Sequence, residues 1–337
     1  MLVRMNQAVS AAIAAEMRDD PTVVLWGEDI GESGGVFKAT VGLFEEFGAD
    51  RVRDTPISEM GFLGAAVGAA ATGLRPIVEI MFVEFLGVAL DQLVTEAAMF
   101  RYLSAGEYSA GITLRASAGA GLGFGAQHSQ MLDRWVIGSP GMTVVVPSSA
   151  RTAYGLLRSA IRTDDPVLVL EPRQLYGTRS DFEPGDDAVL PLGKAEFIAA
   201  GTDVTLVGLG STVPTIGEAM EGSRWSADAI DLLTIVPWDS EAVLDSVSRT
   251  GRLVIVEEGP EQGGWGADVA ATVASKAFDS LKAPIVRMTT PDVPIAFAQS
   301  LEERFLPSAT DVAHAVDELV FSGRCVSPWW EREGLVT

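Results

Sequence analysis

The sequence contains one cysteine, Cys325, among its 337 residues. A single cysteine cannot form an intramolecular disulfide, so a disulfide-stapled secreted domain is excluded and a reducing, cytoplasmic location is expected. The longest apolar stretch, Gly61 to Leu74, is glycine-rich and shorter than the ~20 residues that a membrane helix needs. Residues 5–15 are interrupted by Asn6 and Gln7, and their apolar positions recur at helical spacing. They predict an amphipathic first helix, and no membrane partner is expected.

Positive charge is also scarce, because 24 lysines and arginines stand against 46 acidic residues and give a formal net charge of −22. This balance argues against nucleic acid and anionic membranes as partners. It permits a basic protein partner, although plain solubility explains it equally well. Histidine is rarer still, with only His128 and His314 in the chain.

What the sequence does contain is an alternation of apolar, strand-like runs with helix-like segments, the pattern of parallel α/β sheets. In the first half, strands are expected at 22–26, 77–82, 111–114, 143–146 and 166–170, and helices at 6–19, 58–72, 84–103 and 149–162. Residues 178–192 lose this periodicity and gather Asp, Pro and Gly, which predicts a linker there.

A second alternation follows the linker. Strands are expected at 203–208, 228–235, 252–257 and 284–288, and helices at 212–222, 239–248, 264–279 and 309–320. The fold class is therefore α/β, with two domains of mainly parallel sheets flanked by helices, at residues 1–180 and 193–322. An irregular tail is expected at 323–337. Its Trp329 and Trp330 can dock on another subunit or pack back on their own domain.

One carboxylate, Glu59, stands where a loop should turn into a helix. Pro56 keeps the preceding backbone extended, and Ser58 is a suitable N-cap. The helical stretch that follows, residues 63–71, has almost no side-chain bulk, so a flat ligand can approach the head of the helix closely. The alternative is that Glu59 only complements the helix dipole, and the local sequence leaves both open.

His128 follows a loop of small residues, 116–126, which lets backbone approach a ligand and lets a side chain project. Histidine transfers protons well near neutral pH, so His128 is a candidate catalytic residue, whereas His314 lies in an expected helix and suits a surface or capping role. The glycines of GAGLGFG, residues 119–125, lack the strand–helix context and acidic residue of a dinucleotide fingerprint. Residues 208–212 predict a simple turn.

Three segments carry a family resemblance: GEDIGESGGVFKATVGLFEEFG, RVRDTPISEMGFLGAAVGAAATGLRPIVEIMF and GAQHSQ. Together they resemble the beta subunit of the thiamine-diphosphate-dependent 2-oxoacid dehydrogenases, over roughly residues 4–320. The resemblance implies a transketolase-like pyrimidine-binding domain followed by a transketolase C-terminal-like domain. It also implies that His128 lines the active site and that Glu59 hydrogen-bonds the cofactor's aminopyrimidine ring. Phe85 is then expected to stack on the ring, and Ile57 and Met81 to line its pocket. Glu28 is implied as a second acid that links two active sites.

The metal-binding GDG segment of thiamine-diphosphate enzymes is absent from the sequence, where the nearest approach is Gly185-Asp186-Asp187 in the expected linker. The resemblance implies that an alpha subunit supplies this half of the site with its Mg²⁺, in an alpha2-beta2 heterotetramer. The implied reaction is decarboxylation of a 2-oxoacid with acyl transfer to a lipoyl-bearing acyltransferase component. A structural K⁺ is implied at Ile112, Ala160, Ile161, Thr163 and Asp165.

The chain departs from the family pattern at Gly138, where a histidine is usual, at Met99, where a lysine is usual, and at Val293. These departures leave the substrate open, including the choice between a 2-oxoacid and acetoin. A transketolase-like split subunit is an alternative, although two histidines are few for binding sugar phosphates. An inactive scaffold paralogue is another, although it would not need Glu59 and His128. A nicotinamide-dependent dehydrogenase lacks its fingerprint.

Overall fold

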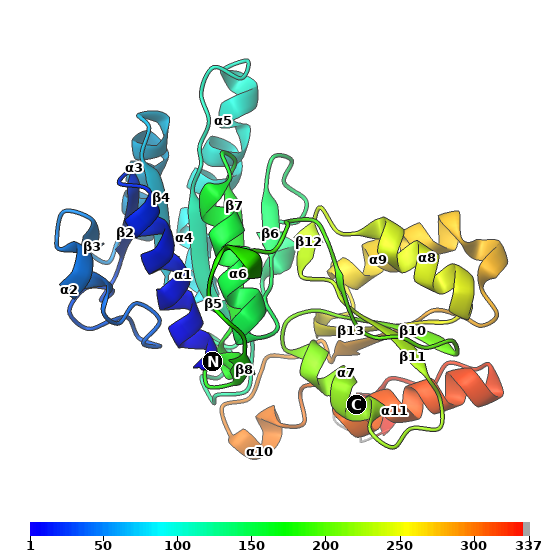
Figure 1. Ribbon diagram of the computed structural model, residues 1–337. Helices are drawn as coiled ribbons and strands as arrows, with labels where there is room; N and C mark the ends of the chain where they lie inside the picture. Colours follow the sequence, from blue (N-terminus) through cyan, green and yellow to red (C-terminus); the bar gives the residue numbers. More distant parts are fainter. Residues whose placement is uncertain (333–337) are drawn as a thin grey trace. The chain divides into compact units, whose positions relative to one another are not determined.

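The computed structural model describes residues 1–332 and divides into two compact units, which are described separately (Figure 1). Unit 1 contains residues 1–118 and 135–192, and unit 2 contains residues 119–134 and the chain from residue 193. The loop that carries His128 thus belongs to unit 2, although the expected first domain, 1–180, included it.

Unit 1 is built on a parallel sheet whose strands follow the order β6-β7-β5-β4-β2-β3. These strands are β2 (Val23–Gly27), β3 (Val52–Asp54), β4 (Arg75–Ile80), β5 (Thr113–Ala118), β6 (Thr143–Val145) and β7 (Val167–Pro172). Ile77, Leu114 and Leu168 are fully buried on the central strands. Continuous apolar runs are typical of strands covered on both faces, and that pattern made most of them predictable. The first and last strands of the unit, β1 (Leu2–Arg4) and β8 (Arg179–Asp181), pair antiparallel.

The helices of unit 1 agree with the expected ones except that α2 was not expected and one long helix is divided. They are α1 (Met5–Asp19), α2 (Leu43–Phe47), α3 (Glu59–Ala71), α4 (Leu86–Asp91), α5 (Ala98–Leu103) and α6 (Ala150–Arg162). The single helix expected over 84–103 is divided into a 3₁₀ turn η1 (Val83–Phe85), α4, a π-helical turn η2 (Gln92–Ala97) and α5. Such π-helical turns carry no simple sequence signal and are often found at functional sites.

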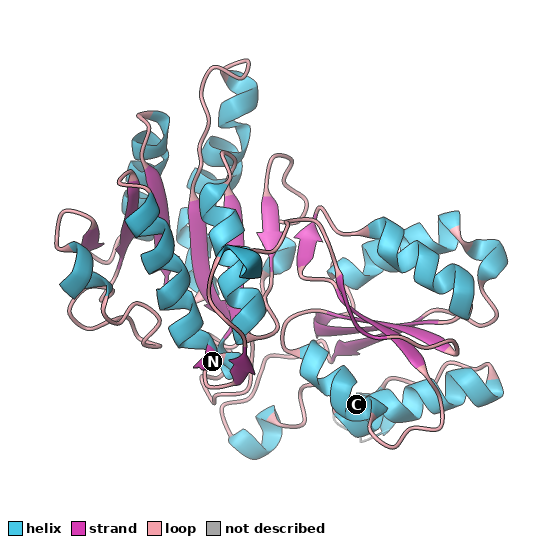
Figure 2. Cartoon of the chain, in the orientation of Figure 1, coloured by secondary structure: helices cyan, strands magenta, loops and turns pink. Residues whose placement is uncertain are grey.

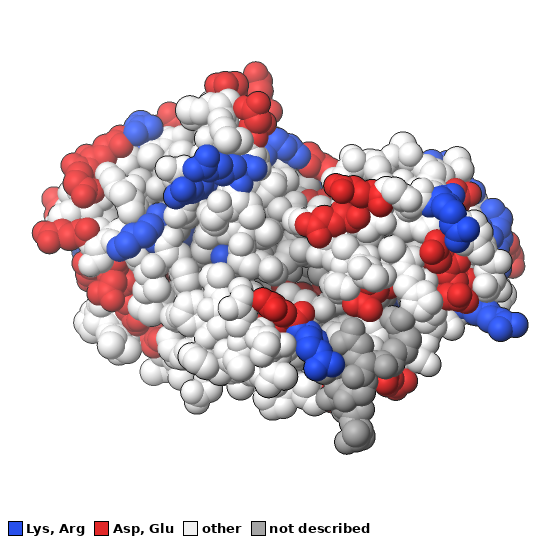
Figure 3. All heavy atoms as spheres, turned by 90° about the horizontal axis from the view of Figure 1, so that it is seen from below, with Lys and Arg blue, Asp and Glu red and all other residues white. Residues whose placement is uncertain are grey.

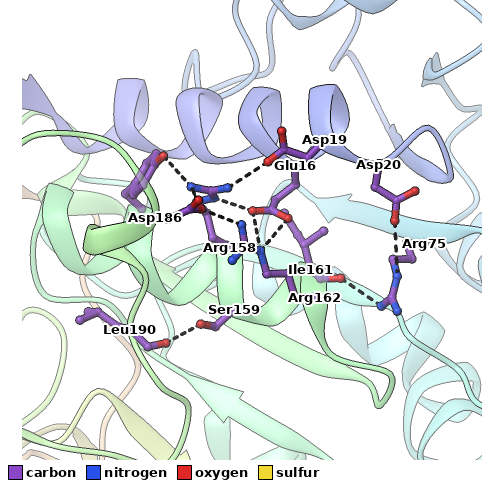
Figure 4. A network of polar contacts seen from close by, with 11 residues as sticks. Glu16, Asp19, Asp20, Arg75, Arg158, Ser159, Ile161, Arg162, Asp186 and Leu190 are labelled. Carbon is purple, nitrogen blue, oxygen red and sulfur yellow. Dashed lines mark hydrogen bonds and ion pairs between the residues drawn. The ribbon is translucent and has the colours of Figure 1, made fainter.

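Helices α1 and α6 are joined by a network of ion pairs (Figure 4). The guanidinium of Arg158, buried on α6, donates to Glu16 of α1, and Arg162 donates to both carboxylate oxygens of Glu16 at 3.0 Å. Asp186 accepts from Arg162 at 3.0 Å. Because buried charges are stable only when paired, these contacts fix how the two helices pack.

Unit 2 is built on a second sheet with the strand order β14-β13-β10-β11-β9, in which only β9 is antiparallel. Helices α8 and α9 cover one face of it, and α7 and α11 cover the other (Figures 1 and 2). The elements are β9 (Glu196–Ala199), β10 (Val204–Gly208), α7 (Thr212–Met220), β11 (Ala227–Asp231), α8 (Ser240–Thr250), β13 (Leu253–Pro260), α9 (Trp265–Lys276), β14 (Val286–Thr290) and α11 (Ala309–Asp317).

The strand expected over 228–235 is two strands, because Leu233 takes a positive φ of 56° between β11 and β12 (Thr234–Val236). Short helices α10 (Gln299–Glu302) and α12 (Trp329–Arg332) were not expected. Trp329 packs back on unit 2, where it is buried and its indole N–H donates to the carbonyl of Thr289 at 3.1 Å. The rest of the expected tail, residues 333–337, lies outside the described residues.

Within residues 1–332, no helix has both the length and the apolar character to cross a membrane. On the face drawn in Figure 3, acidic and basic side chains are interspersed among uncharged ones. The net negative charge of the chain therefore does not form one continuous acidic surface on this face.

Candidate active site

The residues expected to bind the aminopyrimidine lie at one edge of the unit 1 sheet. Glu28 follows the carboxyl end of β2 directly, Glu59 comes after β3 at the first turn of α3, and Met81 follows β4 directly. Because β4, β2 and β3 are neighbouring parallel strands, their carboxyl ends meet at the same edge. Ligands in open α/β sheets bind outside this edge.

Two backbone segments are tied together at this edge. The carboxylate of Asp54 accepts a hydrogen bond from the Gly31 N–H at 2.8 Å, and the Thr55 N–H donates to the Gly27 carbonyl at 2.9 Å. A Cβ added at Gly31 would lie 2.7 Å from an Asp54 oxygen, so only glycine allows this approach. The loop that carries Glu28 is therefore held against the segment that leads to Glu59.

Glu28 and Glu59 form a pair of unequal carboxylates. Glu28 is buried, and one of its oxygens, Oε1, has no hydrogen-bond partner among the described residues. Burial raises the pKa of Glu28, and the negative charges of Glu59 and Asp29 raise it further. Glu59 is half-buried. Glu28 therefore favours its protonated form more than an exposed glutamate does.

Ser58 occupies the N-cap position of α3 but makes no side-chain cap hydrogen bond, contrary to the expectation from sequence. The small side chains of α3 serve packing at Gly64, where a Cβ would lie 2.7 Å from the Gln92 side chain. Ile57 and Met60 flank Glu59 and are 86% and 57% exposed. Both apolar side chains therefore lie outside the core of unit 1.

The aromatic residue expected to stack on the aminopyrimidine, Phe85, is half-buried in the 3₁₀ turn η1. Its ring meets Phe82 edge-on, with ring centroids 5.9 Å apart. Phe82 in turn lies under the guanidinium of buried Arg173, 4.9 Å from the ring centroid. Phe85 is thus braced by an aromatic neighbour, and its stacking role stays a prediction.

Sequence reasoning missed a buried cluster of charges on the central strands. Arg115 of β5 is 1% exposed and donates two hydrogen bonds to Glu171 of β7, at 2.7 and 2.8 Å, and one to Glu79 of β4 at 2.5 Å. Tyr176 donates its hydroxyl to Glu171 at 2.7 Å. Burial alone would lower the pKa of Arg115, but Glu171 and Glu79 outweigh it and raise that pKa. The available signal was a charged residue inside each of three apolar strands.

His128 is half-buried in a glycine loop of unit 2, and its backbone N–H donates to the Gly125 carbonyl at 3.2 Å. Glycines 119, 121, 123 and 125 all have positive φ, between 70° and 102°. Other residues rarely adopt this backbone, which explains the alternation of glycines that resembles a phosphate loop. The structure places His128 in unit 2 and Glu59 in unit 1.

The loop also carries a buried acid, Asp133. It is 2% exposed, its Oδ2 has no hydrogen-bond partner among the described residues, and burial raises its pKa to about 7. Arg134 opposes this shift and Glu257 adds to it. An unfolded aspartate has a pKa of about 3.9. At pH values between that pKa and the raised one, Asp133 is therefore protonated in the folded chain and ionised in the unfolded chain.

Stability should therefore fall as pH rises from about 4 through 7, by on the order of 4 kcal/mol at this one site. Asp133→Asn cannot ionise and should remove that part of the pH dependence. We expect the gap in Tm between pH 5 and pH 8 to narrow in the variant, as measured by thermal unfolding. Equal gaps in the variant and the unmodified chain would contradict the buried, protonated state of Asp133.

The residues expected around K⁺ contribute oxygens that already have partners in unit 1. The guanidinium of Arg75 donates to the carbonyl of Ile161 at 3.3 Å (Figure 4) and to the carbonyl of Thr163 at 3.0 Å. The Ile112 and Ala160 carbonyls accept from Val167 and Thr163 N–H groups, and the carboxylate of Asp165 pairs with Arg101 at 2.5 Å. Each carbonyl keeps a second lone pair, so the donor type suits K⁺, whose binding here stays a prediction.

Among residues 1–332, no group of three or more His, Cys, Asp and Glu side chains is arranged to hold a metal ion. At the departure from the family pattern, Gly138 is exposed and an added Cβ would have no neighbour within 4 Å. The structure therefore does not require glycine there, and it offers no physical reason for the loss of the usual histidine.

Comparison with known proteins places the two halves of the chain. Residues 2–179 match the family model of the transketolase pyrimidine-binding domain, and residues 193–312 match that of the transketolase C-terminal domain. A solved structure described as a split-gene transketolase, inactive beta4 tetramer, is similar with a TM-score of 0.78 and 24% identity, over 96% of this chain and 99% of that one. At this identity the likeness shows the fold alone.

Relatives found by sequence indicate the family more specifically than the likeness in fold does. The chain is 44% identical over 319 residues to the pyruvate dehydrogenase E1 component subunit beta of Rhizobium meliloti, spanning 94% of this chain and 69% of that protein. It is 41% identical to the beta subunit of acetoin:2,6-dichlorophenolindophenol oxidoreductase from Cupriavidus necator, over 94% and 97% of the two chains. It is 39% identical to the 2-oxoisovalerate dehydrogenase subunit beta of Bacillus subtilis, over 93% and 97%. The expected resemblance is confirmed: the chain belongs to the family of beta subunits of the thiamine-diphosphate-dependent 2-oxoacid dehydrogenases.

Proposed function

We propose that this chain is the beta subunit of an enzyme that decarboxylates a 2-oxoacid, or cleaves acetoin, and passes the acyl group to a lipoyl group. It acts with an alpha subunit in an alpha2-beta2 assembly and with a lipoyl-bearing acyltransferase component. The observation that carries this proposal is the pair Glu28 and Glu59 at the carboxyl edge of the unit 1 sheet, in a chain with relatives named for these reactions. Identities of 39–44% to beta subunits named for pyruvate, acetoin and 2-oxoisovalerate do not select one substrate.

In this proposal, unit 1 holds the aminopyrimidine ring of the cofactor. Glu59 shares a proton with a ring nitrogen, Phe85 stacks on the ring, and Ile57 and Met81 line its sides. Thiamine diphosphate, when bound, supplies the carbon nucleophile that protein side chains lack. The chain's own part is to orient the ring and to hold one proton at Glu59.

Glu28 is the second acid of this arrangement. Its buried Oε1 and its raised pKa favour the protonated form. Glu28 can then give a proton to the Glu59 carboxylate after the Glu59 carboxyl group has given up its own, and by the family resemblance Glu28 links two active sites of the assembly. The Mg²⁺ and the diphosphate-binding segment belong to the alpha subunit, and K⁺ has a structural role at residues 112, 160, 161, 163 and 165.

By the family resemblance, His128 acts on the substrate side of the reaction rather than on the aminopyrimidine ring. His128→Ala should lower the rate of lipoyl acylation by about 100-fold or more, as for the loss of a proton-transfer group, with little change in thiamine-diphosphate affinity. The two quantities are measured on the assembled enzyme by lipoyl-domain acylation and by calorimetry. A collapsed affinity in an enzyme that is fully active once loaded would contradict this role.

A transketolase-like subunit is the second candidate, because the similar solved structure is described as a split-gene transketolase. At 24% identity it supports the fold only, and the closer sequence relatives support the dehydrogenase. The test is co-expression of the chain with a candidate alpha subunit, then product analysis over pyruvate, branched-chain 2-oxoacids, acetoin and a ketose phosphate. We expect decarboxylation or acetoin cleavage with lipoyl acylation. Two-carbon transfer from the ketose alone would favour the transketolase.

A further inference from the structure

The segment before His128, residues 119–125, lies outside any helix or strand. Glycines are the most flexible residues, so ordering a segment that alternates them costs more conformational entropy than ordering other residues. A side chain at the end of such a segment is fixed only if other parts of the protein bind its backbone. Unit 2 provides that binding with two carboxylates that are distant in sequence.

The first is Glu302, at the end of α10. Its Oε1 accepts a hydrogen bond from the Gly121 N–H at 2.9 Å, and its Oε2 accepts from the Gly123 N–H at 2.7 Å. Glu302 is only 3% exposed. Both oxygens of one buried carboxylate thus bind two amides of the same loop, which fixes orientation as well as distance.

The second carboxylate is Glu258 on β13. It accepts from the Ala120 N–H at 2.6 Å and from the hydroxyl of Ser211. The two ends of the loop are joined by a hydrogen bond in which the Gly119 N–H donates to the carbonyl of Gln130 at 2.9 Å. Four amides of the segment, those of residues 119, 120, 121 and 123, are therefore bound by three partners before the chain reaches His128.

We propose that Glu302 is a positioning residue for His128, acting through the amides of Gly121 and Gly123. Among the described residues, the side chain of Glu302 makes hydrogen bonds only with the loop. Glu258 also binds Ser211, so its loss would disturb more than the loop. The kinetic part of the proposal rests on the role proposed for His128, whereas the ordering of the loop does not.

The structural test measures hydrogen exchange of residues 119–134 in the full-length chain. In Glu302→Gln one acceptor oxygen becomes an NH₂ group that faces an amide donor. Charge-assisted hydrogen bonds slow opening strongly, so exchange at Gly121 and Gly123 should rise about 10- to 100-fold. Glu302→Asp keeps the charge with a shorter reach and should give an intermediate rise. Glu303→Gln, at the exposed neighbouring position, is the matched control and should leave exchange unchanged.

The kinetic test uses the same variants assembled with the alpha subunit. Glu302→Gln should lower kcat for lipoyl acylation about tenfold or more, leave thiamine-diphosphate affinity unchanged, and be partly rescued in Glu302→Asp. If the glutamine variant does not fold, the same test is made by comparing exchange at Gly121 and Gly123 in Glu302→Asp with exchange in the unmodified chain, where both glycines should exchange slowly. Unchanged exchange in the variants overturns the proposal. Faster exchange with full activity keeps Glu302 as the loop's anchor and overturns its link to catalysis through His128.

Discussion

Replacing Glu59 with glutamine should lower decarboxylation by the assembled enzyme about 100- to 10,000-fold, the range expected for a lost proton-transfer group. Glutamine has the same shape, but its amide cannot take or return the proton that Glu59 shares with the bound ring. Folding should change little, because Glu59 is half-buried and its interaction with the helix dipole contributes only about 0.5 kcal/mol. Steady-state rates with the alpha subunit present, alongside gel filtration for assembly, measure both effects.

Glu45→Gln is the matched control for this variant. Glu45 is an exposed acid in the first turn of another helix of unit 1, α2. Loss of the same charge at the same kind of helix position should leave the rate within about twofold of the unmodified enzyme, as expected for an exposed surface substitution. Unmodified turnover in Glu59→Gln would remove Glu59 from the site and would leave only its interaction with the helix dipole.

The chain on its own should show no decarboxylation, and activity should appear only when an alpha subunit is added. The stacking and Glu59 contacts provide only ~2–4 kcal/mol gross. Association costs ~4 kcal/mol or more in lost freedom, so these contacts leave no net affinity. The diphosphate, with its metal ion, carries most of the electrostatic attraction, and the sequence has no GDG segment to bind it. Carbon dioxide release from each 2-oxoacid, measured with and without the alpha subunit, checks this expectation.

Most strands of the two sheets, although not β3 or β9, and the place of Glu59 could be predicted because their signals are local. Buried parallel strands are continuous apolar runs, and a small-residue helix after an acid is visible within a few positions. β3 and α2 were missed, because Val52–Asp54 is mostly polar and Leu43–Phe47 is too short for helical periodicity. The division of the helix expected over 84–103 into η1, α4, η2 and α5 also had no local signal in the sequence.

The parts of the site that depend on long-range contacts could not be predicted from sequence. Glu302 is about 180 positions from the glycines that it binds, and nothing in its own segment indicates a partner. Arg115 was visible as a charge in an apolar strand, but its two carboxylate partners follow from the strand order. The missing cap of Ser58 shows that a favourable residue type does not ensure the hydrogen bond.

Titration calorimetry of this chain with thiamine diphosphate and magnesium, alone and after assembly with the alpha subunit, tests the central claim most directly. The account predicts no measurable binding by the chain alone and clear binding by the assembly, because the two chains each supply half of the site. Micromolar binding by a homo-oligomer that contains no second chain would contradict it, since the diphosphate site would then lie within this chain.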